Sequence, residues 1–215
     1  MEFGIFNLMG ARETEKSAAQ VFAEVAEQTR LADELGYHTA WFAEHHFSNY
    51  CLCASPLMMV AHCASITNNI RLGTAVLVLP LYNPARLAAE IATADALSNG
   101  RLSLGIGAGY QPYEFERFGV DLKQNLEMTE EFAEILDLAL NRDFFSYNGK
   151  HYRLPETHIP GPHGAAAPAD LCRRAYPGDV SLGGAPGLSR PVLGPGRRRR
   201  AVGRAIRRHR RGVRG

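Results

Sequence analysis

The sequence predicts an α/β fold with a parallel sheet over about its first 160 residues. Four strand-like segments alternate with four helical segments in this part of the chain. Strands and helices that alternate at this spacing are typical of parallel sheets with right-handed crossovers. The third strand-like segment, Ile70 to Leu79, is nearly all apolar, which indicates a strand buried on both faces of such a sheet.

Helix start and stop signals define four successive βα units. The first helix has Val21 and Val25 at helical spacing and stops at Gly36. Ser55 and Pro56 give the second helix a capping serine and a proline at its first position. The expected strands cover residues 2–7, 39–43, 70–79 and 102–106, and the expected helices cover residues 17–35, 55–65, 83–97 and 125–141.

The later elements carry similar signals. An asparagine before a proline at 83–84 starts the third helix, and an Asn-Gly pair at 99–100 ends it. Residues 144–152 predict a small hairpin with another Asn-Gly pair at its turn. Beyond Pro155 the regular pattern fades.

The chain changes character near residue 163. Up to His163 it holds 11 Lys and Arg against 20 Asp and Glu, whereas from Gly164 onward it holds 13 Arg, no Lys and two Asp. Of these last 52 residues, 36 are Arg, Gly, Ala or Pro. They show no helical or strand periodicity, so a packed structure is not expected there.

Two interpretations of this basic tail remain open. It is either disordered or an out-of-frame translation of a GC-rich gene, because GC-rich codons encode Arg, Gly, Ala and Pro. A native tail would bind nucleic acid non-specifically through phosphates, by way of arginine runs such as 197–200. No aromatic residue interleaves the arginines, which argues against stacking on bases. Nucleic acid is therefore not the partner that we expect.

Several classes of protein are excluded by composition. No run of 18 apolar residues occurs, and the N-terminus lacks the basic and apolar regions of a signal peptide. The four cysteines show no CxxC spacing and fit a reducing compartment better than a disulfide framework. We therefore expect a cytoplasmic protein with no membrane partner.

The strongest candidate site is the segment Glu44-His45-His46, which ends the second strand. The carboxyl ends of parallel strands face the binding crevice, and histidine acts as a base near neutral pH. Two adjacent histidines also occur as plain loop residues. A zinc site is not expected, because Cys51 and Cys53 are separated by one residue where zinc sites use two to four.

A glycine-rich loop, residues 105–110, follows the fourth strand. Its GxGxG spacing lacks the third glycine and the later acidic residue of a dinucleotide-binding site. Gly107 and Gly109 remove side chains at a strand end, so the backbone there can approach a flat ligand closely. A plain tight turn is the alternative.

Three motifs taken together resemble the bacterial luciferase-like flavin monooxygenase family over about residues 1–160. They are the segment 41–47, the strand 73–80, and the segment 97–110 with Glu114-Phe115 and Phe118-Gly119 after it. The resemblance implies a TIM (β/α)8 barrel, of which the chain holds about the first four βα units. We therefore divide the chain into the N-terminal half of such a barrel, residues 1–160, and the tail, residues 161–215.

The resemblance also implies an activity. Reduced FMN, supplied by a separate flavin reductase, or in some relatives a deazaflavin, reacts with O2 to oxygenate a small organic substrate. His45 would be the catalytic base, and Glu44 would orient the site. A homodimer would form through helices near the start of the barrel. The alternatives are a half-barrel remnant without catalysis and the nucleic-acid binder described above.

The cofactor contacts that the resemblance implies lie in two loops. The flavin ring would lie against a non-proline cis peptide at Ala75-Val76. Some relatives carry an arginine for the cofactor phosphate where Ala108 stands, so a phosphate contact is not expected here. The residues implied along the flavin edge are Gly107, Ala108, Gly109 and Tyr110, and Phe6, Tyr82 and Tyr110 would accommodate an apolar group.

Overall fold

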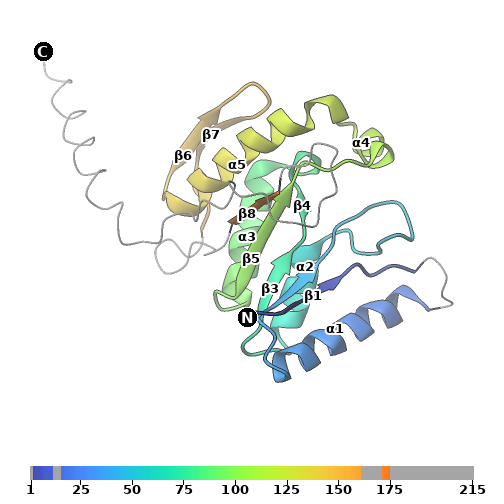
Figure 1. The fold of residues 1–215 in the computed structure, drawn as a ribbon. Coiled ribbons are helices and arrows are strands. Elements are labelled where there is room, and N and C mark those ends of the chain that lie inside the picture. Colours follow the sequence, from blue (N-terminus) through green and yellow to red (C-terminus); the bar gives the residue numbers. More distant parts are fainter. Residues whose placement is uncertain (1, 12–15, 161–170, 175–215) are drawn as a thin grey trace, which may run out of the picture.

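The computed structural model describes residues 2–11, 16–160 and 171–174 (Figure 1). The strands are β1 (Gly4–Asn7), β2 (Thr39–Phe42), β3 (Arg71–Thr74), β4 (Leu77–Val78), β5 (Leu102–Gly107), β6 (Phe145–Asn148), β7 (Arg153–Thr157) and β8 (Leu171–Arg174). The helices are α1 (Ala18–Glu34), α2 (Pro56–Ala64), α3 (Pro84–Leu97), α4 (Pro112–Phe118) and α5 (Asn125–Asn141), with short 3-10 turns η1 (Leu79–Leu81) and η2 (Leu122–Gln124).

The main sheet is parallel throughout the described residues. β1 pairs with β2, β2 with β3, and β3 with β5. β4 and β8 both pair with Ile106 and Gly107 of β5, so they lie on opposite edges of that strand. Only Ala75 and Val76 join β3 to β4, which is too short a link to cross β5. The strand positions are therefore β1, β2, β3 with β4, β5 and β8.

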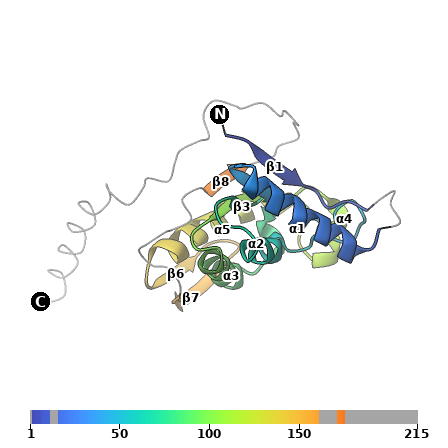
Figure 2. The same cartoon turned by 90° about the horizontal axis from the view of Figure 1, so that it is seen from below.

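Four helices form one layer against this sheet. α2 packs between α1 and α3, and α3 packs against α5. Figure 2 shows this row of helices on one side of the strands. β1, β2, β4 and β5 are each followed in the sequence by a helix, as in successive βα units. The predicted α/β class and its four βα units are confirmed.

Local signals explain most helix starts. The side chain of Ser17 accepts the N–H of Gln20, and the Gln20 side chain accepts the N–H of Ser17, which makes a capping box. Asn83 accepts the N–H of Arg86 in the same way. Ser55 precedes α2, but its side chain makes no capping hydrogen bond. The proline at the first position of α2 is therefore the start signal that holds there.

The core lies between the sheet and the helices. The largest fully buried side chains come from both layers: Phe42, Phe115, Phe132, Ile70, Leu72, Leu77, Leu79, Leu87, Ile91, Leu102, Leu104 and Ile106. All six residues of β5 are buried, which fits a central strand covered on both faces. The antiparallel hairpin of β6 and β7 was predicted, although it extends to Thr157.

Three features differ from the sequence-based expectation. The apolar run 70–79 is not one strand, because it breaks between Thr74 and Leu77 into β3 and β4. Helix α4 lies in a loop where no helix was expected. Strand β8 lies in the tail, where we expected no strand, and takes the free edge of β5. The other expectations for residues 161–215 lie outside the described residues.

No helix within the described ranges is both long enough and apolar enough to cross a lipid bilayer.

Candidate active site

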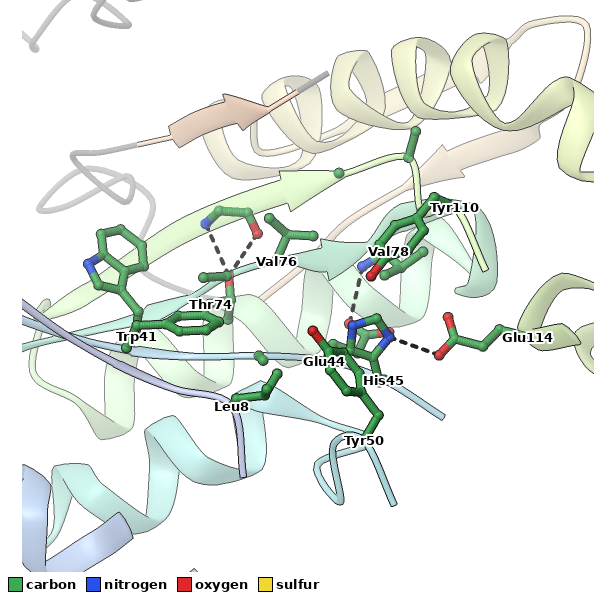
Figure 3. Close-up of a pocket in the computed structure, with 17 residues that line it drawn as sticks. Leu8, Trp41, Glu44, His45, Tyr50, Thr74, Val76, Val78, Tyr110 and Glu114 are labelled. Atoms are coloured by element: carbon green, nitrogen blue, oxygen red, sulfur yellow. Dashed lines mark hydrogen bonds and ion pairs between the residues drawn. The ribbon is translucent and has the colours of Figure 1, made fainter. Parts of the chain in front are cut away.

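A cavity of about 600 Å³ lies at the carboxyl ends of the parallel strands (Figure 3). All eight predicted site residues line it: Glu44, His45, Ala75, Val76, Gly107, Ala108, Gly109 and Tyr110. The other lining residues are Phe6, Leu8, Trp41, Ala43, Tyr50, Thr74, Val78, Gly105 and Glu114. Residues as far apart in the sequence as Phe6 and Glu114 meet here, because they lie at or just after the ends of strands of the same sheet.

His45 is held by a carboxylate that sequence reasoning did not assign. Its Nδ1 lies 3.0 Å from Oε1 of Glu114, and the same oxygen accepts the backbone N–H of His46 at 2.8 Å. Because this Glu114 oxygen acts as an acceptor for the His46 N–H, we assign it as the acceptor for His45 as well, with the imidazole hydrogen on Nδ1. His45 Nε2 then carries the lone pair, which is the arrangement of a general base oriented by a carboxylate.

Glu44 is hydrogen-bonded to the other histidine, His46. Its Oε1 lies 2.9 Å from Nε2 of His46, and its Oε2 accepts the backbone N–H of Val78 at 3.1 Å. Burial raises the pKa of Glu44, although His46 and the Val78 N–H act in the opposite direction. Glu44 thus contacts His46 and β4, and its expected role in orienting the site stays a prediction.

Glu114 reaches the cavity from helix α4. Its side chain is almost fully buried, with 1% relative exposure. The helix has proline at its first position and ends at Gly119, whose φ of 69° is left-handed. Proline at the start and glycine after the end are helix signals, so residues 112–119 contained the information that predicts α4.

Backbone forms much of the cavity wall. The peptide bond between Ala75 and Val76 is cis, as the family resemblance implied. Gly109 has a φ of 73°, and a Cβ there would overlap the side chains of Val78 and Phe115. Packing within the chain therefore requires glycine at 109, in addition to any close approach by a ligand. Residues 107–109 add almost no side-chain bulk to the wall.

Aromatic side chains surround His45. The rings of Tyr50 and Tyr110 meet the imidazole edge to face, with centroids 5.0 and 5.9 Å away. Tyr110 is 56% exposed and Phe6 is 60% exposed, so both line an open part of the cavity. Tyr82 does not line it. Its hydroxyl is buried, and burial together with the nearby Glu44 carboxylate raises the pKa of Tyr82.

The nearby thiols are unsuited to chemistry. Cys51 and Cys53 are buried and free. Burial raises the pKa of Cys51 and raises that of Cys53 to about 12, so neither is a thiolate at neutral pH. Within the described part of the chain, no group of three His, Cys, Asp or Glu side chains is arranged to hold a metal ion.

The cavity fits a flat aromatic group better than a phosphate. Its wall offers the backbone of 75–76 and 107–109 together with the aromatic rings around His45. None of the described lining residues is Lys or Arg. Ala108, where an arginine would hold a cofactor phosphate in some relatives, lines the wall with a methyl group only.

Comparisons with known proteins show which family the chain resembles. The sequence model described as luciferase-like monooxygenase matches residues 1–191, beyond the boundary at residue 160 that we expected. An uncharacterized protein of Sinorhizobium fredii, y4vJ, is 50% identical over 159 residues, which cover 74% of this chain and 45% of that protein. The oxygenase component of flavin-dependent trigonelline monooxygenase from Acinetobacter baylyi is 32% identical over 159 residues, covering 73% and 44%.

A solved structure shows the same fold. The oxygenating constituent of 3,6-diketocamphane monooxygenase from Pseudomonas putida, in complex with FMN, superposes with a TM-score of 0.71 at 26% identity. The match covers 80% of this chain and 51% of that one. The chain thus spans about half the length of the relatives that it matches, and its parallel sheet corresponds to part of a TIM barrel. The chain belongs to the luciferase-like monooxygenase family.

Proposed function

We propose that the chain forms the flavin-ring and proton-transfer part of an oxygenase that uses reduced FMN and O2 on a small organic substrate. The observation that carries the proposal is the His45–Glu114 pair at a cavity with a flat backbone wall. The trigonelline enzyme is named as flavin-dependent, and the diketocamphane enzyme holds FMN. A deazaflavin has a ring of the same shape and remains the alternative cofactor.

The residues proposed to hold the ring are those of the wall. Ala75 and Val76 would lie against one face, and Gly107, Ala108, Gly109 and Tyr110 would lie along an edge. When bound, reduced flavin supplies the electrons for O2 activation. His45 Nε2 faces the same space and accepts a proton from a group bound there, while Glu114 stabilises the resulting imidazolium. Glu44 holds His46 and β4 in position beside this pair through its two hydrogen bonds.

A separate reductase is part of the same proposal. The trigonelline relative is named as an oxygenase component, and a reductase would supply reduced flavin to this chain in the same way.

A homodimer through α2 and α3 is also proposed. These helices border an outer groove of about 880 Å³ in which Met58 is 73% exposed and Leu97 is 62% exposed. Apolar side chains in such a groove favour contact with another protein surface. Light scattering of the purified chain should give twice the monomer mass, and Met58→Glu with Leu97→Glu should give the monomer. A monomeric wild type would contradict the dimer.

The activity is tested by separating binding from turnover. Trp41 is the sole tryptophan and lines the cavity, so flavin bound there should quench its fluorescence. Turnover is product formation from a panel of aldehydes, terpenes and sulfonates with a flavin reductase present. His45→Ala should lower turnover by about 100-fold or more and leave the flavin Kd nearly unchanged. His62→Ala, which changes an exposed histidine on α2, is the matched control.

The outcomes separate the two candidate functions. Equal loss of binding and turnover in His45→Ala would contradict the role as base. Flavin binding by the wild type without turnover on any substrate would favour the second candidate, a flavin-binding half-barrel without catalysis. That candidate is favoured by the sheet itself, because the described strands fill five positions and a complete TIM barrel has about eight.

A further inference from the structure

The edge between β3, β4 and β5 has a gap in its ladder. Paired residues end at Gly73 with Ser103 and resume at Leu77 with Ile106. The three residues 74–76 therefore lie opposite only two residues of β5, 104 and 105. One extra residue on one of two paired strands is a β-bulge. Ala75 and Val76, inside this gap, line the cavity. The gap is where the chain leaves the sheet and becomes cavity wall.

The hydroxyl of Thr74 closes the gap. It donates to the carbonyl of Gly105 at 2.9 Å and accepts the N–H of Gly105 at 3.0 Å. Figure 3 shows both bonds converging on this one oxygen. Thr74 is fully buried, so water cannot readily take over these two hydrogen bonds if the hydroxyl is removed. One side-chain oxygen thus satisfies both backbone groups of Gly105 on the edge that faces β3 and β4, where the ladder is interrupted, while Gly105 pairs with Cys172 of β8 on the other edge.

The absence of a side chain at Gly105 allows the close contact with Thr74. A Cβ at this position would collide with the backbone carbonyl of Thr74. Glycine therefore lets β5 approach close enough for the hydroxyl to reach both groups. On the other side of the gap, the N–H of Ala75 donates to the carbonyl of Phe42 at 2.7 Å. The segment 74–75 is thus fixed to both neighbouring strands.

We propose that Thr74 is a positioning residue for the cavity. Its hydroxyl takes the place of two ladder hydrogen bonds and so frees the backbone of Ala75 and Val76 to form the wall. The effect of Thr74 on flavin binding rests on the proposed function.

Thr74→Val tests the structural part, because valine keeps the shape and lacks the hydroxyl. The N–H and carbonyl of Gly105 become buried groups without partners, so exchange of the Gly105 amide should speed up by about tenfold or more. Amides in α3 provide the reference for any global loss of stability. Thr74→Ser keeps the oxygen and should restore slow exchange. Unchanged Gly105 exchange in Thr74→Val would overturn the proposal.

Thr29→Val is the matched control for binding. Thr29 is also fully buried, and its hydroxyl donates to the Val25 carbonyl at 2.8 Å within α1, away from the cavity. At a temperature where all variants are folded, Thr74→Val should raise the flavin Kd about tenfold, while Thr74→Ser and Thr29→Val stay near wild type. Equal Kd values for Thr74→Val and Thr29→Val would overturn the positioning role. If the wild type binds no flavin, the proposed function fails, and Gly105 exchange still decides the role of Thr74.

Discussion

Replacement of Glu114 should reveal how the site is built. Its Oε1 accepts two donors, His45 Nδ1–H and the His46 backbone N–H, in a nearly fully buried position. Glu114→Ala leaves both donors without an acceptor at about 1–3 kcal/mol each, so we expect about 2–6 kcal/mol lower free energy of unfolding. Glu114→Gln keeps an acceptor oxygen and loses only the charge, so about 2 kcal/mol is expected.

The assay is urea unfolding followed by circular dichroism at constant pH. Glu116, two residues along α4, is exposed, so Glu116→Ala and Glu116→Gln should stay within about 0.5 kcal/mol of wild type. Both Glu114 variants should also lower turnover, with the alanine variant worse, because it no longer fixes the hydrogen on His45 Nδ1. Equal losses for Glu114→Ala and Glu114→Gln, or a loss in Glu116→Ala as large as in Glu114→Ala, would refute the reasoning.

Three further changes have defined outcomes. Gly109→Ala should lower the free energy of unfolding in urea by about 2–4 kcal/mol, because the new Cβ overlaps neighbouring side chains and the residue has a left-handed φ. Gly36→Ala is the control: its φ is also left-handed but its Cβ meets nothing within 4 Å, so the loss should be only about 1–2 kcal/mol. Burial raises the pKa of Glu44, so the contribution of Glu44 to stability should fall as pH rises above about 4.5, and the unfolding free energy of wild type relative to Glu44→Gln should fall over the same range. Glu131 accepts three successive N–H groups of the hairpin loop, so Glu131→Gln should speed exchange of those amides severalfold without changing exchange in α1.

The sequence predicted the parts of the molecule that local patterns determine. Apolar alternation and helix caps placed four βα units, because periodicity reports which face of an element is buried. Glu44, His45, Gly107 and Gly109 were found for a related reason, because residues at the carboxyl ends of parallel strands meet at one edge of the sheet. Ala75, Val76, Ala108 and Tyr110 were implied by the family resemblance. His45 and Gly107 come together although 62 residues separate them. Their roles toward a cofactor and substrate stay predictions.

Features that depend on tertiary contact were missed. The pairing of Glu114 with His45 joins residues 69 positions apart and is invisible to any local pattern. The break after Thr74 was hidden because the residues on both sides are apolar, and only the partner strand shows that the ladder stops. β8 is four residues long and has no periodicity, so the free edge of β5, not its own composition, accounts for its pairing.

The distribution of charge in the cavity leads to a last prediction. The described lining has two carboxylates and no Lys or Arg, so it offers the flavin ring a wall but gives a phosphate nothing to pair with. A phosphate held by arginine gains about 1.5–3 kcal/mol, or about tenfold or more in affinity. We therefore expect riboflavin and FMN to quench Trp41 with Kd values within about threefold of each other. A tenfold preference for FMN would contradict this and would require a cationic contact from residues outside the described ranges, such as the arginines after residue 174. Deletion of residues 175–215 would then remove the preference if those arginines supply the contact.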